Sequence, residues 1–394
     1  MGLNDTPSAN RIHIGFFGCR NAGKSSVVNA ITGQDLAVVS DTPGTTTDPV
    51  RKAMELLPLG PVMIIDTPGF DDEGELGGLR MQKTKRILNR TDMALLVVDA
   101  KRGLQETDKK LISFFREKEI PYLIVKNKSD LLEQVPEPKE NEIYVSALTG
   151  EGVEDCKEKM GKMVCVENRT VPIVKDLIQP SDFVILVVPI DSSAPKGRLI
   201  LPQQQTIREI LEAGATAVAV RETELGETLQ AVGKRPSLVI TDSQVFEQVS
   251  AEVPEDIPLT SFSILMARYK GYLETAVDGV SAVEHLQDGD RILIAEGCTH
   301  HRQCEDIGSV KIPKWLKQYT NRELRIELSS GQDFPDDLSP YSLVIHCGGC
   351  MLNEREVQFR MKCAARQGIP FTNYGITIAY MKGILQRSCE IFNQ

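Results

Sequence analysis

A chain of 394 residues that is 41% hydrophobic and 25% charged is long enough for several folded domains, and its composition excludes a mainly disordered, collagenous or repeat-dominated protein. Its longest apolar runs, such as 94–98 and 183–189, are far shorter than the roughly 18–20 residues that span a bilayer. The formal net charge of -10 argues against broad electrostatic binding of nucleic acid but leaves room for a local basic site. We therefore expect a cytoplasmic protein with no membrane and no nucleic acid among its partners.

The first part of the chain, from residue 13 to about residue 164, alternates short β-branched runs with helix-like segments. Strands are predicted at 13–17, 62–66, 94–99, 122–127 and 143–146, and helices at 24–31, 79–89 and 107–117. This alternation indicates a mostly parallel sheet covered by helices on both faces, so the fold class is α/β.

The rest of the chain carries the same pattern in two smaller parts. After an aperiodic stretch at 165–171, the second part is predicted to contain strands at 183–190, 217–220 and 238–241 and helices at 203–211 and near 227. A Pro-containing segment at 253–258 leads to a last part with a predicted helix at 272–286 and strands at 292–295 and 342–346. We expect three α/β domains, at residues 1–168, 169–262 and 263–394.

Residues 18–25, Gly-Cys-Arg-Asn-Ala-Gly-Lys-Ser, have the spacing of a phosphate-binding loop. The segment follows a predicted strand and opens a predicted helix, which is the context that this pattern requires. Backbone N–H groups would hold the phosphates, the Lys24 ammonium would reach the β and γ oxygens, and the Ser25 hydroxyl would bind Mg²⁺. The residues assigned to this part of the site are Gly18, Asn21, Ala22, Gly23, Lys24, Ser25 and Ser26.

Three further motifs follow at predicted strand ends, at residues 66–69, 127–130 and 146–148. Asp66 can hold the metal through water, and the Gly69 amide can sense the γ-phosphate. The Asp130 carboxylate matches the N1 and N2 donors of guanine, a pair of donors that adenine lacks. These motifs together predict a GTP-binding domain. The residues assigned to the base pocket are Asn127, Lys128, Asp130, Ser146, Ala147 and Leu148.

These motifs resemble those of the translation-factor-related GTPases, above all the TrmE/Era-like subgroup of the tRNA-modification GTPase MnmE and Era. The resemblance implies that residues 44–48 are switch I with Thr46 as a metal ligand, although Thr47 stands where the subgroup usually has arginine. Phe70 stands where many GTPases have a water-orienting glutamine, so hydrolysis needs another source of charge stabilisation. Members with an asparagine at the position of Asn21 use K⁺ there, which implies slow, K⁺-stimulated hydrolysis. The residues assigned to hydrolysis are Lys24, Thr46, Asp66 and Gly69.

The last part of the chain carries a cluster of cysteines and histidines. Cys298 and His300 come directly after one predicted strand, and residues 346–350, His-Cys-Gly-Gly-Cys, come directly after another. Ligand sites gather at the carboxyl ends of strands in an open α/β sheet, and the two glycines let Cys347 and Cys350 point at one centre. Thiolates and imidazoles are metal ligands, so this pattern predicts a metal site. The residues assigned to it are Cys298, His300, His346, Cys347 and Cys350.

The ligand types do not decide which metal is bound. Three thiolates and a histidine satisfy tetrahedral Zn²⁺, and three thiolates with an exchangeable fourth ligand hold an iron–sulfur cluster equally well. Cys304 is expected only to pack nearby, and His301 is expected to support a ligand or face solvent.

The combination of parts resembles the FeFe-hydrogenase maturation GTPase family (HydF) over nearly the whole chain. Its most specific part is residues 298–300, Cys-Thr-His, followed by residues 346–350, and residues 196–202 give secondary support. The resemblance implies a 4Fe-4S cluster on Cys298, Cys347 and Cys350. It leaves the fourth iron to His300, His346, another oxygen ligand such as Asp191, or solvent. It also implies that the middle domain forms a homodimer.

The resemblance further implies a scaffold that carries a diiron precursor to apo FeFe-hydrogenase, with the radical-SAM maturases HydE and HydG as further partners. The implied cofactors are GTP or GDP, Mg²⁺, K⁺ and the 4Fe-4S cluster. Two other functions stay open: a ribosome- or tRNA-associated GTPase with a zinc-binding tail, and a GTP-regulated chaperone that inserts metal into a different metalloenzyme. The acidic charge counts against the first. Neither alternative explains the tail motif and the domain order together.

Overall fold

The computed structural model describes residues 6–35, 50–67, 84–167, 171–190, 199–297, 306–331 and 333–393. The chain separates into two compact units, Met1–Arg169 and Thr170–Gln394, and each has its own sheets. Within these described stretches, every helix is too short or too polar to cross a membrane.

The first unit is built on a six-stranded sheet in the order β2-β3-β1-β4-β5-β6. Its strands are β1 (Ile12–Phe17), β2 (Val50–Leu56), β3 (Gly60–Asp66), β4 (Met93–Asp99), β5 (Tyr122–Asn127) and β6 (Glu142–Val145). All neighbours are parallel except β2, which is antiparallel to β3. The predicted α/β class with a mostly parallel sheet is confirmed. The sequence analysis missed β2, because this edge strand is largely exposed and charged residues interrupt its apolar positions.

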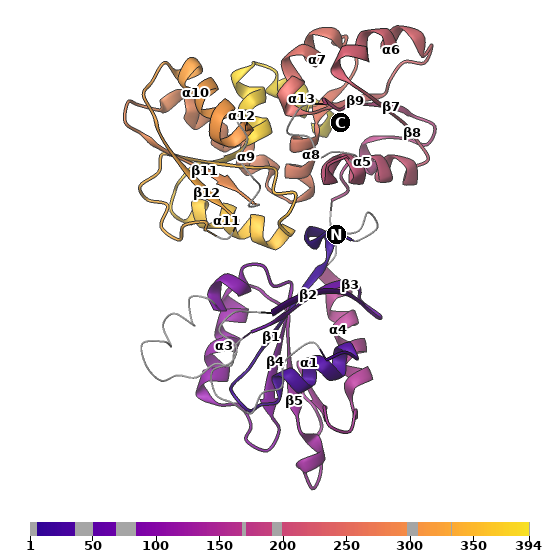
Figure 1. Ribbon diagram of the computed structural model, residues 1–394, viewed down its shortest axis with the longest axis vertical. Helices are drawn as coiled ribbons and strands as arrows, with labels where there is room; N and C mark the ends of the chain where they lie inside the picture. Colours follow the sequence, from indigo (N-terminus) through magenta and orange to yellow (C-terminus); the bar gives the residue numbers. More distant parts are fainter. Residues whose placement is uncertain are drawn as a thin grey trace. The chain divides into compact units, whose positions relative to one another are not determined.

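Helices cover both faces of this sheet. Figure 1 shows α1 (Lys24–Thr32) and α4 (Val153–Glu167) on one side and α3 (Glu106–Glu117) on the other. Successive side chains of a strand point to opposite faces, so Leu95 packs in the core beneath α1 and α4 while Leu96 packs beneath α3. Burial on both faces explains why these strands are continuous apolar runs in the sequence. Of the helix predicted at 79–89, residues 84–88 are helical, and its first residues lie outside the described part.

The second unit contains two four-stranded sheets whose strand pairs are all parallel. The first has the order β10-β9-β7-β8, with β7 (Phe183–Val187), β8 (Thr216–Val220), β9 (Leu238–Thr241) and β10 (Leu259–Ser261). The second has the order β12-β11-β13-β14, with β11 (Arg291–Glu296), β12 (Arg325–Ser330), β13 (Leu343–His346) and β14 (Phe371–Asn373). The helices are α5 (Leu201–Glu212), α6 (Leu225–Ala231), α7 (Phe246–Glu252), α8 (Phe262–Tyr269), α9 (Leu273–Val280), α10 (Ile312–Thr320), α11 (Glu354–Arg366), α12 (Tyr374–Met381) and α13 (Leu385–Cys389).

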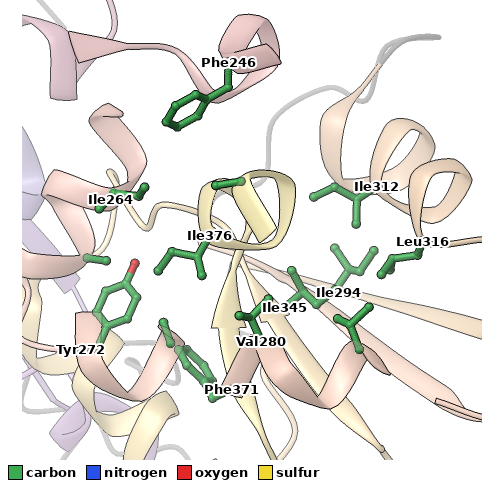
Figure 2. Close-up of a cluster of buried hydrophobic side chains, with 14 of the residues drawn as sticks. Phe246, Ile264, Tyr272, Val280, Ile294, Ile312, Leu316, Ile345, Phe371 and Ile376 are labelled. Carbon is green, nitrogen blue, oxygen red and sulfur yellow. The ribbon is translucent and has the colours of Figure 1, made fainter. Parts of the chain in front are cut away.

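One hydrophobic core joins the two sheets of the second unit. Figure 2 shows Phe246 and Ile264, from the helices around the first of these sheets, in the same cluster as Ile294 and Ile345 from β11 and β13. Ile376 of α12 lies between these two groups. Because side chains around both sheets bury their apolar surface in this one cluster, each sheet contributes to the stability of the other.

Gly279 of α9 lies where this helix approaches the backbone of β14 closely. A Cβ atom at this position would collide with the Phe371 carbonyl oxygen in β14 and lie 2.8 Å from the Phe371 nitrogen. Backbone atoms cannot move aside as a flexible side chain can, so only glycine lets the helix pack at this distance.

We expect Gly279→Ala to lower the free energy of unfolding by about 1–3 kcal/mol, the usual cost of overpacking, although alanine favours helix formation. Gly226→Ala in α6 is the matched control, because its Cβ would meet only the Glu252 carboxylate at 3.6 Å. Urea denaturation of both variants gives the comparison. Equal stability of the two variants would contradict the close approach.

Candidate functional site

The phosphate-binding loop runs from the end of β1 to the start of α1. A Cβ atom at Gly18 (φ 151°) would collide with the Val97 carbonyl oxygen, and one at Gly23 (φ 82°) would collide with the Asn127 side-chain amide. Asn21 also has a positive φ, of 63°. The glycines of the motif are therefore required by positive φ and by close approach to neighbouring elements. Ser25 and Ser26 lie in the first turn of α1, where backbone N–H groups are available to a phosphate.

The two charged residues predicted to handle phosphate and metal are in contact. The Lys24 ammonium forms an ion pair with the Asp66 carboxylate at the end of β3, and both side chains are nearly buried. The next residue, Thr67, donates a hydrogen bond to the Phe16 carbonyl at 2.6 Å, which fixes the end of β3 beside β1. Lys24 and Asp66, which are 42 residues apart in the sequence, are thus in contact in the structure.

The residues predicted to bind the base form one hydrogen-bonded network with the loop. Asn127 donates to the Ala22 carbonyl at 3.1 Å and accepts from the Ala147 amide at 3.1 Å. The Lys128 ammonium donates to the Asn21 carbonyl at 2.9 Å. In a separate contact, the Ser146 hydroxyl donates to an Asp130 carboxylate oxygen at 2.6 Å. These contacts tie three loops at the carboxyl edge of the sheet into one site. Leu148 is 87% exposed beside this network.

We expect Asp130→Asn to weaken GTP binding at least about tenfold, because the carboxylate would make charge-assisted bonds to the two guanine donors. Xanthosine triphosphate carries a carbonyl in place of the guanine amino group, so it should bind this variant better than the wild type does. Fluorescent-nucleotide titration measures both affinities. Unchanged GTP affinity would contradict the assignment of Asp130 to the base pocket.

The two cysteines at the end of β13 occupy a hydrogen-bonded loop in the second unit. Cys347 continues the pairing of β13 with β11 by donating its amide to the Ala295 carbonyl at 2.8 Å. Its sulfur accepts hydrogen bonds from the Gly297 amide at 3.0 Å and the Gly349 amide at 3.3 Å. Burial raises the pKa of the Cys347 thiol, and the bond from Gly297 opposes that rise. Sulfur with two N–H donors is a suitable environment for a metal-bound thiolate.

His346 lies fully buried behind this loop, tilted against the Phe371 ring. Its Nε2 atom is 3.2 Å from an Arg360 guanidinium nitrogen, and its Nδ1 atom is 2.6 Å from the Cys347 carbonyl oxygen. Because arginine only donates, Nε2 is the acceptor and Nδ1 carries the proton. Burial, followed by the Arg360 charge, lowers the pKa of His346 to about 3, so the ring is neutral. Both ring nitrogens are thus engaged, which favours a supporting role for His346 rather than metal ligation.

Two buried cations, which the sequence analysis missed, flank the loop. Arg360 of α11 is 1% exposed, contacts the Glu356 carboxylate at 3.1 Å and donates to the Gly331 carbonyl at 2.5 Å. Lys270, which follows α8, is 3% exposed and donates to the carbonyls of Gly349 and Leu352. Burial lowers the pKa of Lys270 to about 8, and the neighbouring Cys350 and Cys347 oppose that change. Nothing in the local sequence distinguishes these residues from solvated charges on helices.

The remaining predicted residues lie outside the described part of the chain. They are Thr46 and the rest of 44–48, Gly69, Phe70, Asp191, Cys298, His300, His301 and Cys304. Among the residues that are described, no three His, Cys, Asp or Glu side chains form a metal-binding group. The bond from Gly297 to Cys347 nevertheless brings the chain directly before Cys298 to the Cys347 sulfur.

The fold and these sites define a GTP-binding protein of the phosphate-loop class with an added cysteine-bearing α/β unit. Family models match three successive parts of the chain: a 50S ribosome-binding GTPase domain at 13–128, a hydrogen maturase F dimerization domain at 173–271, and a hydrogen maturase F tetramerization domain at 274–391. The chain belongs to the hydrogen maturase F family. These domains support GTP hydrolysis, a role in hydrogenase maturation, and oligomerisation.

Curated relatives match less than half of this chain. The tRNA modification GTPase MnmE of Nitrosomonas europaea is 37% identical over 139 residues, which cover 34% of this chain and 30% of that protein. The GTPase Der of Wolinella succinogenes is 31% identical over 186 residues, which cover 43% of this chain and 39% of that protein. The chain thus spans about a third of the length of these relatives. Among solved structures, Aquifex aeolicus Era bound to GDP and AlF₄⁻ is 19% identical, with a TM-score of 0.36, covering 56% of this chain and 98% of that one.

Proposed function

We propose that this protein is a GTP-hydrolysing scaffold that binds a 4Fe-4S cluster and delivers the diiron precursor of the active site to apo FeFe-hydrogenase. The observation that carries the proposal is the Cys347–Cys350 loop on the hydrogen maturase F part of the chain, with the segment before Cys298 bonded to the Cys347 sulfur. The proposed partners are apo FeFe-hydrogenase and the maturases HydE and HydG, with a homodimer through the middle domain, in the cytoplasm. The domain boundaries at 168 and 262 and the assigned site residues stay predictions.

The described residues fit an iron–sulfur cluster. Cys347 and Cys350 lie three residues apart at the carboxyl end of β13, with amide donors to the Cys347 sulfur and a lysine beside the loop. We propose that Cys298, Cys347 and Cys350 hold three irons, and that His300, Asp191, another oxygen ligand or solvent takes the fourth. A cluster with an exchangeable ligand on one iron supplies an attachment point for a second metal centre. His346 would orient the Cys347 carbonyl instead of binding iron, because both its nitrogens have partners.

Residues already in contact at the nucleotide site would bind the phosphates, Mg²⁺ and the base. Lys24 would exchange its Asp66 partner for the β and γ oxygens, leaving Asp66 to hold Mg²⁺ through water, with Ser25 and Thr46 as direct ligands. The hydrogen bonds of Asn127 with Ala22 and Ala147 would hold the phosphate loop and the base pocket in fixed relative positions. GTP binding would then modulate association with partners.

We expect Cys347→Ser to lose the cluster. After anaerobic reconstitution with iron and sulfide, the wild type should show broad visible absorption and a reduced-state EPR signal of a 4Fe-4S cluster, and the variant should show neither at comparable iron. Cys363→Ser is the matched control, because Cys363 lies on α11, outside the loop. A colourless wild type with one zinc per chain would overturn the scaffold and favour the RNA-associated GTPase with a zinc-binding tail.

We expect GTP hydrolysis to be faster in KCl than in NaCl, because K⁺ held near Asn21 would stabilise transition-state charge where Phe70 cannot. Asn21→Gly should abolish this difference while leaving nucleotide affinity within a few-fold. Glycine tolerates the φ of 63° at this position, so the loop conformation is retained. Equal rates in the two salts would refute the proposed K⁺ dependence.

A further inference from the structure

Lys270 is a buried ammonium group that holds the cysteine-bearing loop from behind. It follows the last residue of α8, is 3% exposed, and donates to the Gly349 carbonyl and, at 2.8 Å, to the Leu352 carbonyl. These two carbonyls lie on either side of Cys350 in the sequence. One side chain, 79 residues away from Gly349, therefore fixes the turn that presents Cys350.

Among the described residues, the Lys270 ammonium has no carboxylate in direct contact. Throughout the described ranges, no Asp or Glu forms an ion pair with it within 4.0 Å, and the Glu354 carboxylate acts on it only from a longer distance. A buried charge without a counterion is strongly destabilising. The adjacent cation Arg360 differs, because the Glu356 carboxylate contacts it at 3.1 Å. Of these two buried cations, Lys270 is thus the one without a carboxylate in direct contact.

We propose that Lys270 is a positioning and charge-compensating residue of the metal centre, holding the loop in place and supplying the counter-charge for a centre of net negative charge. The inference rests on the proposed function, since it takes the cluster as the negative partner. Three thiolates leave a bound iron–sulfur cluster anionic, and reduction adds a further negative charge. A fixed positive charge nearby stabilises the reduced form more than the oxidised form, so it raises the reduction potential of the cluster.

Two variants separate the hydrogen bonds from the charge. Lys270→Gln keeps donor groups and removes the charge, and Lys270→Met removes both. Lys382→Met is the matched control, because Lys382 belongs to the same unit and pairs with Glu247 at the surface. The readouts are hydrogen exchange of the amides at 347–353 in the metal-free protein and the midpoint potential of the reconstituted cluster.

We expect Lys270→Met, which loses two buried hydrogen bonds, to speed exchange of the loop amides by at least roughly tenfold, and Lys270→Gln to speed it less. Both variants should shift the midpoint potential to more negative values, and the control should change neither quantity. Unchanged exchange in Lys270→Met would overturn the positioning role, and an unchanged potential in Lys270→Gln would overturn the charge role. A wild type that assembles no cluster would instead refute the proposed function, while the exchange measurement would still test the positioning role.

Discussion

The parallel pairing of β11 with β13 is the constraint on which the position of the Cys347–Cys350 loop depends. Ala295 lies opposite His346 in this register, so the two strands end at the same level and the segments that follow them emerge side by side. The contact between the Gly297 amide and the Cys347 sulfur is the first consequence of that pairing. Side chains alternate between the faces of a strand, so a slip by one residue would turn His346 away from the core. The sheet itself therefore sets the separation of Gly297, the residue before Cys298, from Cys347.

The same principle organises the nucleotide site in the first unit. β1 and β3 are parallel neighbours, with Phe16 opposite Asp66, and both end where the phosphate loop begins. The Lys24–Asp66 ion pair bridges the two strand ends. Residues far apart in the sequence meet at this edge because parallel strands bring all their carboxyl ends together. The nucleotide site and the Cys347–Cys350 loop thus both lie at the carboxyl ends of parallel strands, on separate sheets.

Much of this arrangement could be predicted, because the signals are local. Apolar runs such as β4 and β5 predict strands buried on both faces, and the spacing of Gly18, Gly23 and Lys24 predicts a phosphate loop. The edge strands β2 and β12 were missed, since exposure at an edge leaves no apolar run. β14 has three residues, too few to show a period.

The residues that hold the Cys347–Cys350 loop could not be predicted for a different reason. Lys270 follows the helix Phe262–Tyr269, and Arg360 lies within α11, where charged residues usually face solvent. Their burial arises only when these helices pack against the end of β13. His346 was assigned as a possible ligand because imidazole next to cysteine usually indicates a metal. Its partners, Arg360 and the Cys347 carbonyl, are visible only in three dimensions.

The way in which the loop is held bears on how a carrier works. Lys270 and His346 both hold the loop through main-chain carbonyl oxygens, those of Gly349, Leu352 and Cys347, and not through the cysteine sulfurs. The loop conformation is therefore fixed by hydrogen bonds within the chain, and these bonds do not require a bound metal. Binding of a centre then loses little free energy to ordering of this loop, and release does not require the loop to unfold. A scaffold of the proposed kind, which would load and unload its cargo, would be better served by such a loop than by one that folds around its metal.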